Sequence, residues 1–168
     1  MKSASNENFY LNKLVKSLNN HVDNFRGVAG VAIKDLTCGW YYGINDQLIF
    51  PTASSIKIPI LLKLIESSEA SDLDLLKNIE ITEEMKSKGS GVIHKMNGTI
   101  NLTIENLAIL MINLSDNTAT NLCIDIAGQE EVNKMLEDYE FKSMRLSRKM
   151  QDYIAIKEGK HIHHLNIG

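Results

Sequence analysis

Apolar residues near the start of the chain recur at intervals of three and four, the spacing of one face of an amphipathic helix. The stripe consists of Leu11, Leu14, Val15, Leu18, Val22 and Phe25. Gly27 ends the pattern, and two apolar runs follow, residues 28–33 and 40–44, with a polar turn over residues 35–39 between them. Because short apolar runs joined by such a turn are typical of paired strands, the sequence predicts a helix followed by a β-hairpin.

From Ser54 onward the apolar spacing predicts helices. Residues 54–66 carry isoleucine and leucine side chains on a broad apolar face, and Pro59 lies early enough in this helix to be tolerated. Residues 104–114 are hydrophobic almost all round and follow Thr103, a good N-cap, which predicts a helix at the centre of the fold.

Two more helices are expected after these. Residues 118–127 continue as a helix that Gly128 ends, and the spacing within residues 132–139 marks another amphipathic helix. No convincing strand follows Ile44. A lone two-stranded hairpin is only marginally stable in water. Either the hairpin therefore lies on helices alone, or strands that complete its sheet are missing from this chain.

Composition narrows the class of protein. The chain has 168 residues, which suits one domain or part of a larger one, and 43% are apolar, enough to form a core. The net charge is -3 with dispersed basic residues, which argues against nucleic-acid and anionic-membrane partners. Two cysteines make no disulfide framework, and the start lacks a signal-like apolar stretch. We therefore expect a reduced, cytoplasmic protein without a membrane span.

A serine and a lysine at helical spacing are the first candidates for chemistry. Ser54 and Lys57 form a Ser-x-x-Lys sequence at a strand-to-helix junction. Positions three apart in a helix share a face, so the lysine amine can reach the serine hydroxyl and, with a lowered pKa, accept its proton. A chain of this composition contains about one such pair by chance. An N-capping serine followed by a solvated lysine is the alternative interpretation.

The second candidate is Ser115-Asp116-Asn117, directly after the hydrophobic helix. A break between helices can project a hydroxyl and a carboxamide into a cleft. Ser115 could then pass a proton between Lys57 and a leaving group, and Asn117 could hold an acyl carbonyl or the lysine. The alternative is a helix stop followed by a new N-cap, for which Ser and Asp are both suited.

Together these motifs resemble those of the class A β-lactamase and penicillin-binding protein superfamily. The similarity covers most of residues 10–158, including the helix and hairpin, residues 88–92 and residues 145–152. It implies an α+β fold of the β-lactamase/transpeptidase type, of which this chain carries only the N-terminal part. It also implies a helix and hairpin of the sheet domain in residues 1–50 and a helical domain with both motifs in residues 51–168.

The resemblance assigns a role to each residue of the two motifs. It implies that Ser54 is acylated by a β-lactam, that Lys57 assists as base, that Ser115 relays a proton and that Asn117 binds substrate. The implied partner is a small β-lactam or an acyl-peptide, and no cofactor is implied.

Two departures from the family pattern bear on activity. Class A enzymes carry a Glu, in a Glu-x-x-Leu-Asn pattern, that activates the water for deacylation. After Arg148 that position is occupied by Met150, which we expect to fill the core, and Asp152 is close in sequence. A site without that Glu would be acylated and then hold its product or turn over slowly.

The second departure is the lack of Lys-Thr-Gly before Gly168. That motif binds the substrate carboxylate and supplies one oxyanion-hole N–H, so we expect a truncated product lacking the C-terminal strands.

A group of three histidines is the last candidate for chemistry. His161, His163 and His164 lie near the end of the sequence, but no Cys or clear carboxylate partner frames them, which favours a solvated His-rich tail over a metal site.

The leading hypothesis is a β-lactamase-like serine hydrolase that transfers acyl groups through a Ser54 ester, with this chain alone weak or inactive. One alternative is an inactive truncated remnant. Another is a penicillin-binding or sensor module that is acylated without turnover. A third is a peptidase or esterase that uses the same serine and lysine.

Overall fold

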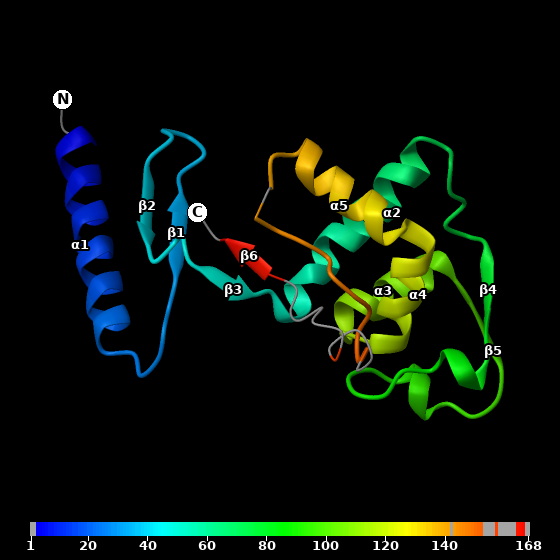
Figure 1. Ribbon diagram of the computed structural model, residues 1–168. Coiled ribbons are helices and arrows are strands. Elements are labelled where there is room, and N and C mark those ends of the chain that lie inside the picture. Colours follow the sequence, from blue (N-terminus) through cyan, green and yellow to red (C-terminus); the bar gives the residue numbers. More distant parts are fainter. Residues whose placement is uncertain (1–2, 142, 153–156, 158–163, 167–168) are drawn as a thin grey trace. The chain divides into compact units, whose positions relative to one another are not determined.

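The computed structural model describes residues 3–141, 143–152, 157 and 164–166, which fold as two compact units (Figure 1). One unit comprises Met1–Phe50 with Asn166–Gly168, and the other comprises Pro51–Leu165. Helices and short strands are both present, as the α+β prediction requires. Among the described residues, no helix is long and apolar enough to cross a membrane.

The first unit consists of a helix and a hairpin. Helix α1 spans Ser3–Asp23, and strands β1 (Val31–Lys34) and β2 (Tyr41–Ile44) pair antiparallel with Val31 opposite Ile44. The Asn19 side chain on α1 donates a 2.6 Å hydrogen bond to the Tyr42 hydroxyl on β2. Both predicted elements are therefore confirmed, and β3 (Ile49–Pro51), which pairs with β6 (His164–Asn166), follows them.

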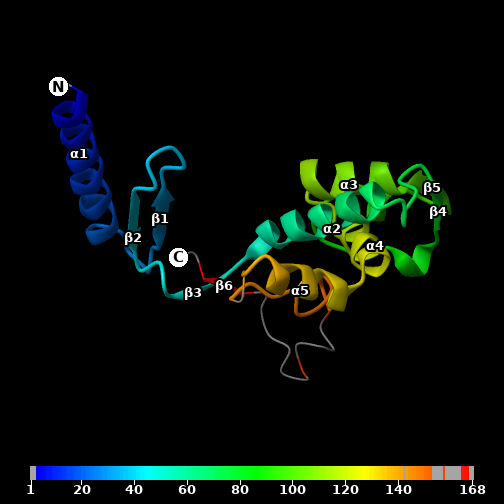
Figure 2. The same ribbon diagram turned by 90° about the horizontal axis from the view of Figure 1, so that it is seen from above.

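The second unit carries the main hydrophobic core, and its described residues include four α-helices. After the 3-10 turn η1 (Ala53–Ile56) come α2 (Lys57–Glu69), α3 (Ile104–Asn113), α4 (Asn117–Ala127) and α5 (Gln129–Asp138). Helix α4 packs against α2, α3 and α5, as both views of the ribbon show (Figures 1 and 2). Fully buried apolar side chains from all four helices meet here, among them Ile60, Leu64, Leu107, Met111, Cys123, Val132 and Leu136.

Local chemistry explains where these helices begin and end. The Thr103 side chain accepts a hydrogen bond from the Asn106 N–H and so caps α3, as predicted. Gly128 ends α4 with φ +79°, a left-handed conformation that glycine adopts without strain. Pro59 is the third residue of α2, where its missing N–H would have had no partner within the helix.

The prediction that no strand follows Ile44 is wrong. Strands β4 (Asn78–Ile81) and β5 (Ile100–Thr103) form an antiparallel pair in the second unit, with Ile81 opposite Ile100. Each strand has four residues, and only every second side chain on β4 is at least half-buried. Two short segments with 18 residues between them leave a weak periodic signal, because most of their stabilisation comes from pairing with each other.

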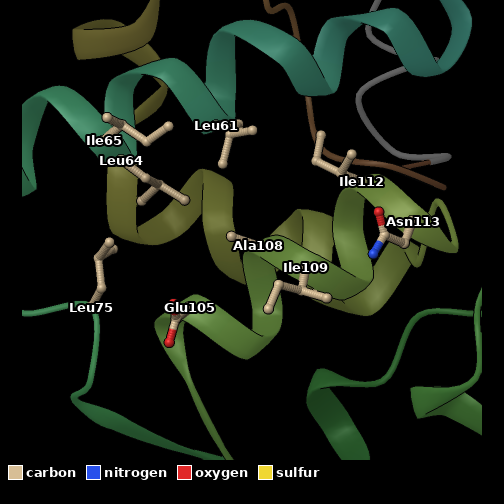
Figure 3. Close-up of a pocket in the computed structure, with 9 residues that line it drawn as sticks. All are labelled: Leu61, Leu64, Ile65, Leu75, Glu105, Ala108, Ile109, Ile112 and Asn113. Atoms are coloured by element: carbon tan, nitrogen blue, oxygen red, sulfur yellow. The ribbon is translucent and has the colours of Figure 1, made fainter.

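Helix α3 is not enclosed on all sides, which corrects the expectation drawn from its continuous hydrophobicity. Ile109 is 49% exposed and Ile112 41% exposed. These side chains line an open apolar groove of about 330 Å³ between α2 and α3, shown in Figure 3. Leu61 and Ile65 contribute from α2, so the groove is a surface feature of the helical unit.

Candidate active site

Ser54 lies where the chain passes from β3 into α2. Thr52 is 6% exposed and accepts the Ser55 N–H through its backbone carbonyl at 3.0 Å, which closes the first turn of η1. Ala53 has φ +46°, a left-handed conformation that is unfavourable for residues other than glycine by about 1–2 kcal/mol. The turn leaves Ser54 exposed to solvent at the N-terminal end of the η1–α2 segment.

Lys57 stands one turn beyond Ser54 and is only 3% exposed. Its Nζ donates to Ser54 Oγ at 3.2 Å, to Ser115 Oγ at 2.6 Å and to the Ser115 carbonyl at 3.0 Å. Ser54 Oγ and Ser115 Oγ are themselves 2.8 Å apart. The three side chains therefore form a closed triangle of hydrogen bonds, and the predicted Ser54–Lys57 contact is present.

Burial shifts the protonation equilibrium of the lysine toward the neutral amine. Desolvation lowers the pKa of Lys57 below its usual value of 10.5, and the negative charge of Asp116 offsets part of this decrease. A lysine with a lowered pKa has a larger neutral fraction near neutral pH. Neutral Nζ can accept a proton from the serine hydroxyl that it already contacts.

The segment between α3 and α4 brings Ser115 to this pair. Ser115 has φ +53°, again a left-handed conformation in a residue other than glycine. Strain of this kind persists only where the surrounding structure enforces it, and it is concentrated at functional sites. The Asp116 N–H donates to the Leu110 carbonyl at 3.2 Å, which holds the turn against the end of α3.

Asp116 joins the start of α4 to a neighbouring loop, a role that the sequence analysis does not predict. Its carboxylate is fully buried and accepts N–H groups from Val92 at 2.6 Å, Ile93 at 2.9 Å and Ala119 at 3.0 Å. One residue thus caps α4 and fixes the loop over residues 88–93. The alternative interpretation of Ser-Asp-Asn includes a new N-cap, but the bonds of Asp116 to the loop join it to residues more than 20 positions away.

Asn117 faces that loop rather than the lysine. Its Nδ2 donates to the Lys88 carbonyl at 3.0 Å, and its backbone N–H donates to the Ser90 carbonyl at 3.0 Å. In the part of the chain that the structure describes, the hydrogen bonds of the Lys57 amine go to Ser54 and Ser115. Of the two roles predicted for Asn117, contact with the lysine is therefore not made.

Met150 is held in place through its backbone. The Asn121 side chain accepts the Met150 N–H at 2.7 Å and donates to the Met150 carbonyl at 3.2 Å. The Met150 side chain packs against the hydrophobic core, as expected from its thioether chemistry. Asn133 holds Leu146 in the same two-bond manner, at 2.8 and 3.0 Å. The side chains of Asn121 and Asn133 thus hold the segment that follows α5 against the helices through hydrogen bonds.

Three histidines and two cysteines are the remaining candidate groups. His161 and His163 lie outside the described residues, and of His164 only its place in β6 is described. Among the side chains that the structure describes, no group of three or more His, Cys, Asp or Glu residues is placed to hold a metal ion. Both cysteines are free, and burial raises the pKa of the Cys123 thiol to about 12.

In this site an exposed serine is hydrogen-bonded to a buried lysine and to the serine of a Ser-Asp-Asn turn. This arrangement is typical of serine–lysine acyl-transfer sites. The chain belongs to the β-lactamase enzyme family, whose profile matches residues 13–164. The β-lactamase-like fold that the motifs implied is thereby confirmed.

Individual relatives agree with this assignment. A β-lactamase from Sphaerobacter thermophilus is 28% identical and superposes on 89% of this chain with a TM-score of 0.75. The structure of PBP-A is 22% identical and covers 92% of this chain with a TM-score of 0.78. Among curated proteins, the β-lactamase regulatory protein BlaB of Streptomyces cacaoi is 23% identical over 121 residues, 71% of this chain.

The match covers only part of each relative. This chain spans 63% of the Sphaerobacter thermophilus chain, 57% of the PBP-A chain and 39% of BlaB. The relatives therefore contain residues with no counterpart in the matched region.

Proposed function

We propose that this chain presents a serine that β-lactams acylate, with Ser54 as nucleophile, Lys57 as base and Ser115 as proton relay. The observation that carries the proposal is the triangle of hydrogen bonds between these side chains, closed at 2.8, 3.2 and 2.6 Å. Membership of the β-lactamase enzyme family supports the same reaction class.

The geometry suggests the order of proton transfers. Neutral Lys57 accepts the Ser54 proton while Ser54 Oγ attacks the lactam carbonyl carbon, which forms the ester bond. The carbon–nitrogen bond of the lactam then breaks, and its nitrogen takes the Ser115 proton, which Lys57 replaces from its ammonium. The site returns with Lys57 neutral and Ser54 esterified, and no cofactor takes part.

We further propose that the ester persists. The family resemblance aligns Met150 with the deacylating Glu, and the Met150 side chain packs against the core. A fold relative supports the acylation step alone, because a PBP-A mutant, 23% identical to this chain, has been solved as an acyl-enzyme complex with penicillin G.

A regulatory role is the second candidate, and one observation favours it. The curated relative BlaB is named a β-lactamase regulatory protein. Stable acylation without turnover is the behaviour that a sensor of β-lactams needs, and it requires the same Ser54 chemistry. A peptidase or esterase and an inactive remnant are the remaining alternatives.

Intact-mass spectrometry tests the proposal. The purified chain is incubated with benzylpenicillin beside Ser54→Ala, which retains the exposed Cys38 and therefore also controls for thiol adducts. We expect one penicillin mass per chain, absent in Ser54→Ala and persistent over hours. No adduct on a chain that is folded by circular dichroism would contradict the proposal and favour the remnant.

A further inference from the structure

Lys86 is a second buried lysine in the helical unit, and its side chain is only 4% exposed. Its ammonium donates to Glu83 Oε1 at 2.8 Å and to the carbonyls of Met96 and Gly98 at 2.6 and 2.8 Å. An ammonium has three N–H donors, so every donor of Lys86 has an acceptor. Met96 and Gly98 follow ten and twelve positions later, so Lys86 joins the two ends of one loop, residues 86–98.

The 86–98 loop is rich in glycine and therefore unfavourable to order. Gly89, Gly91 and Gly98 all have positive φ, at +104°, +106° and +72°. Glycine loses more conformational freedom on folding than any other residue. Hydrogen bonds from a cation are about twice as strong as neutral ones, and here they close the loop at its ends. Both acceptors within the loop are backbone carbonyls, which a change of side chain at those positions leaves in place.

The first residues of α4 bind the same loop. Thr118 is fully buried, and its Oγ1 accepts the Ser87 N–H at 2.9 Å. Asp116 and Asn117 bind the loop further along through their side chains. Three successive residues of the chain therefore depend on where the loop lies. Ser115 directly precedes them, so a displacement of the loop also reaches the serine that contacts the catalytic lysine.

The loop and the Ser-Asp-Asn turn are in direct contact. A Cβ atom placed on Gly91 would lie 2.5 Å from the Cα atom of Asp116, too close for a real side chain. The Asp116 carboxylate is fully buried and holds its two loop N–H groups at 2.6 and 2.9 Å. A loop that moves away breaks these bonds and leaves the carboxylate short of donors, which favours movement of the turn as well.

We propose that Lys86 is a positioning residue for acyl transfer. By closing the 86–98 loop, its ammonium holds the Ser-Asp-Asn turn, and with it Ser115, in the geometry that the proton relay requires. The bonds of Lys86 go to Glu83, Met96 and Gly98, so it acts through the loop and not on the reacting atoms. This inference rests on the proposed acyl-transfer function.

A merely structural role for Lys86 makes a different prediction. If Lys86 only contributed to stability, its removal would lower the midpoint of a urea titration and leave the reaction of the folded protein unchanged. A positioning role lowers the maximal acylation rate of the folded protein, because a misplacement of about 1 Å can slow a reaction about 100-fold. The affinity of the noncovalent complex changes less, since Lys86 does not touch the ligand.

The experiment compares the unchanged chain with Lys86→Met and Lys134→Met under conditions where urea titration shows each to be folded. Lys86→Met keeps a long side chain and removes the cation. Lys134→Met is the matched control, because it removes an exposed ion pair to Asp138 on α5. Intact-mass time courses at several benzylpenicillin concentrations separate the maximal acylation rate from the dissociation constant. Amide hydrogen exchange of residues 87–98, measured without ligand, reports the order of the loop.

We expect Lys86→Met to lower the maximal rate about tenfold or more, to change the dissociation constant less, and to speed exchange in residues 87–98. Lys134→Met should change none of these quantities. Should Lys86→Met fail to fold, Lys86→Gln gives the same test, because its shorter, uncharged side chain is still polar. The expected result for Lys86→Gln is the same.

Equal maximal rates in the Lys86 and Lys134 variants would overturn the proposal, as would weaker binding at an unchanged maximal rate. Unchanged exchange in residues 87–98 would overturn it too. If the unchanged chain forms no adduct, the proposed function is rejected and exchange alone decides the role of Lys86. Faster exchange confined to the Lys86 variant then supports closure of the loop by Lys86, and equal exchange in all proteins overturns it.

Discussion

At the scale of single residues, Lys57 determines how the site should respond to pH. Because burial lowers the pKa of its amine below 10.5, we expect the rate of acylation by benzylpenicillin to rise with pH and level off with a midpoint below that value. The neutral lysine is the active base, so the rate falls on the acid side. Time courses of the intact mass between pH 5 and 10 measure the midpoint.

Lys57→Arg provides the control, because a guanidinium stays protonated throughout this range. It should reduce acylation about 100-fold or more at every pH, within the usual range for loss of a general base. A flat pH profile in the unchanged chain would contradict the assigned role.

The same lowered pKa also affects folding, because the unfolded state binds more protons than the folded state. The unfavourable contribution of Lys57 to the free energy of unfolding therefore becomes smaller as pH rises toward 10.5.

Gly89 offers a second test at this scale. An alanine there adds a methyl group 2.6 Å from Asn117 Nδ2, so either the loop or the amide must move. We expect Gly89→Ala to slow acylation at least tenfold. Gly98→Ala is the matched control, because Gly98 also has positive φ (+72°) but has no atom within 4 Å of the added methyl group. Both variants should lose about 1 kcal/mol of folding free energy from backbone strain, measured by urea titration. Equal acylation rates in the two would contradict the steric argument.

The sequence predicts several of the side-chain contacts in the site. Ser54 and Lys57 are three positions apart in one helical segment, so their contact follows from local geometry. Ser115 joins them because the turn after α3 places it there, and the motif indicated a break at that point. The bonds of Asn117 to Lys88 and of Asp116 to Val92 were not readable, because they join segments whose relative placement depends on the whole helical packing.

At the scale of elements, the Asp116 carboxylate connects a helix to a loop, and its removal should be costly. Asp116→Ala leaves three N–H groups without their acceptor, two of them on the loop. We expect a loss of about 4 kcal/mol or more in the free energy of unfolding, from one cap and two charged hydrogen bonds. Thr103→Ala removes only the cap of α3 and should lose about 1 kcal/mol. Similar losses in urea titrations of the two variants would contradict the double role of Asp116.

The helices were predicted more completely than the strands. Helices α2 to α5 carry long apolar stripes and recognisable caps, such as Thr103 and Gly128, so their existence and approximate ends follow from sequence. Strands β4 and β5 have four residues each and gain their stability from pairing across an intervening loop. The exposed face of α3 was also missed, because hydrophobicity all round a helix does not say which neighbours are available to cover it.

At the scale of the whole molecule, the chain spans about two fifths to two thirds of its relatives' length. These 168 residues contain no Lys-Thr-Gly, the motif to which the family resemblance assigns an oxyanion-hole N–H. Loss of one such donor typically lowers rates by about 100- to 1,000-fold. We therefore expect this chain alone to hydrolyse a chromogenic cephalosporin at a rate barely above that of Ser54→Ala. Robust hydrolysis that disappears in Ser54→Ala would contradict this prediction.

The apolar groove between α2 and α3 has a practical consequence for anyone who monitors folding of this protein. Environment-sensitive dyes such as ANS fluoresce when they enter exposed apolar surface, and their fluorescence is commonly taken as the mark of a molten globule. A groove of about 330 Å³ lined by Leu61, Ile65, Ile109 and Ile112 offers such a dye a binding place on the native state. Dye fluorescence should therefore be high before any denaturant is added, and loss of structure has to be followed by another signal, such as near-ultraviolet circular dichroism.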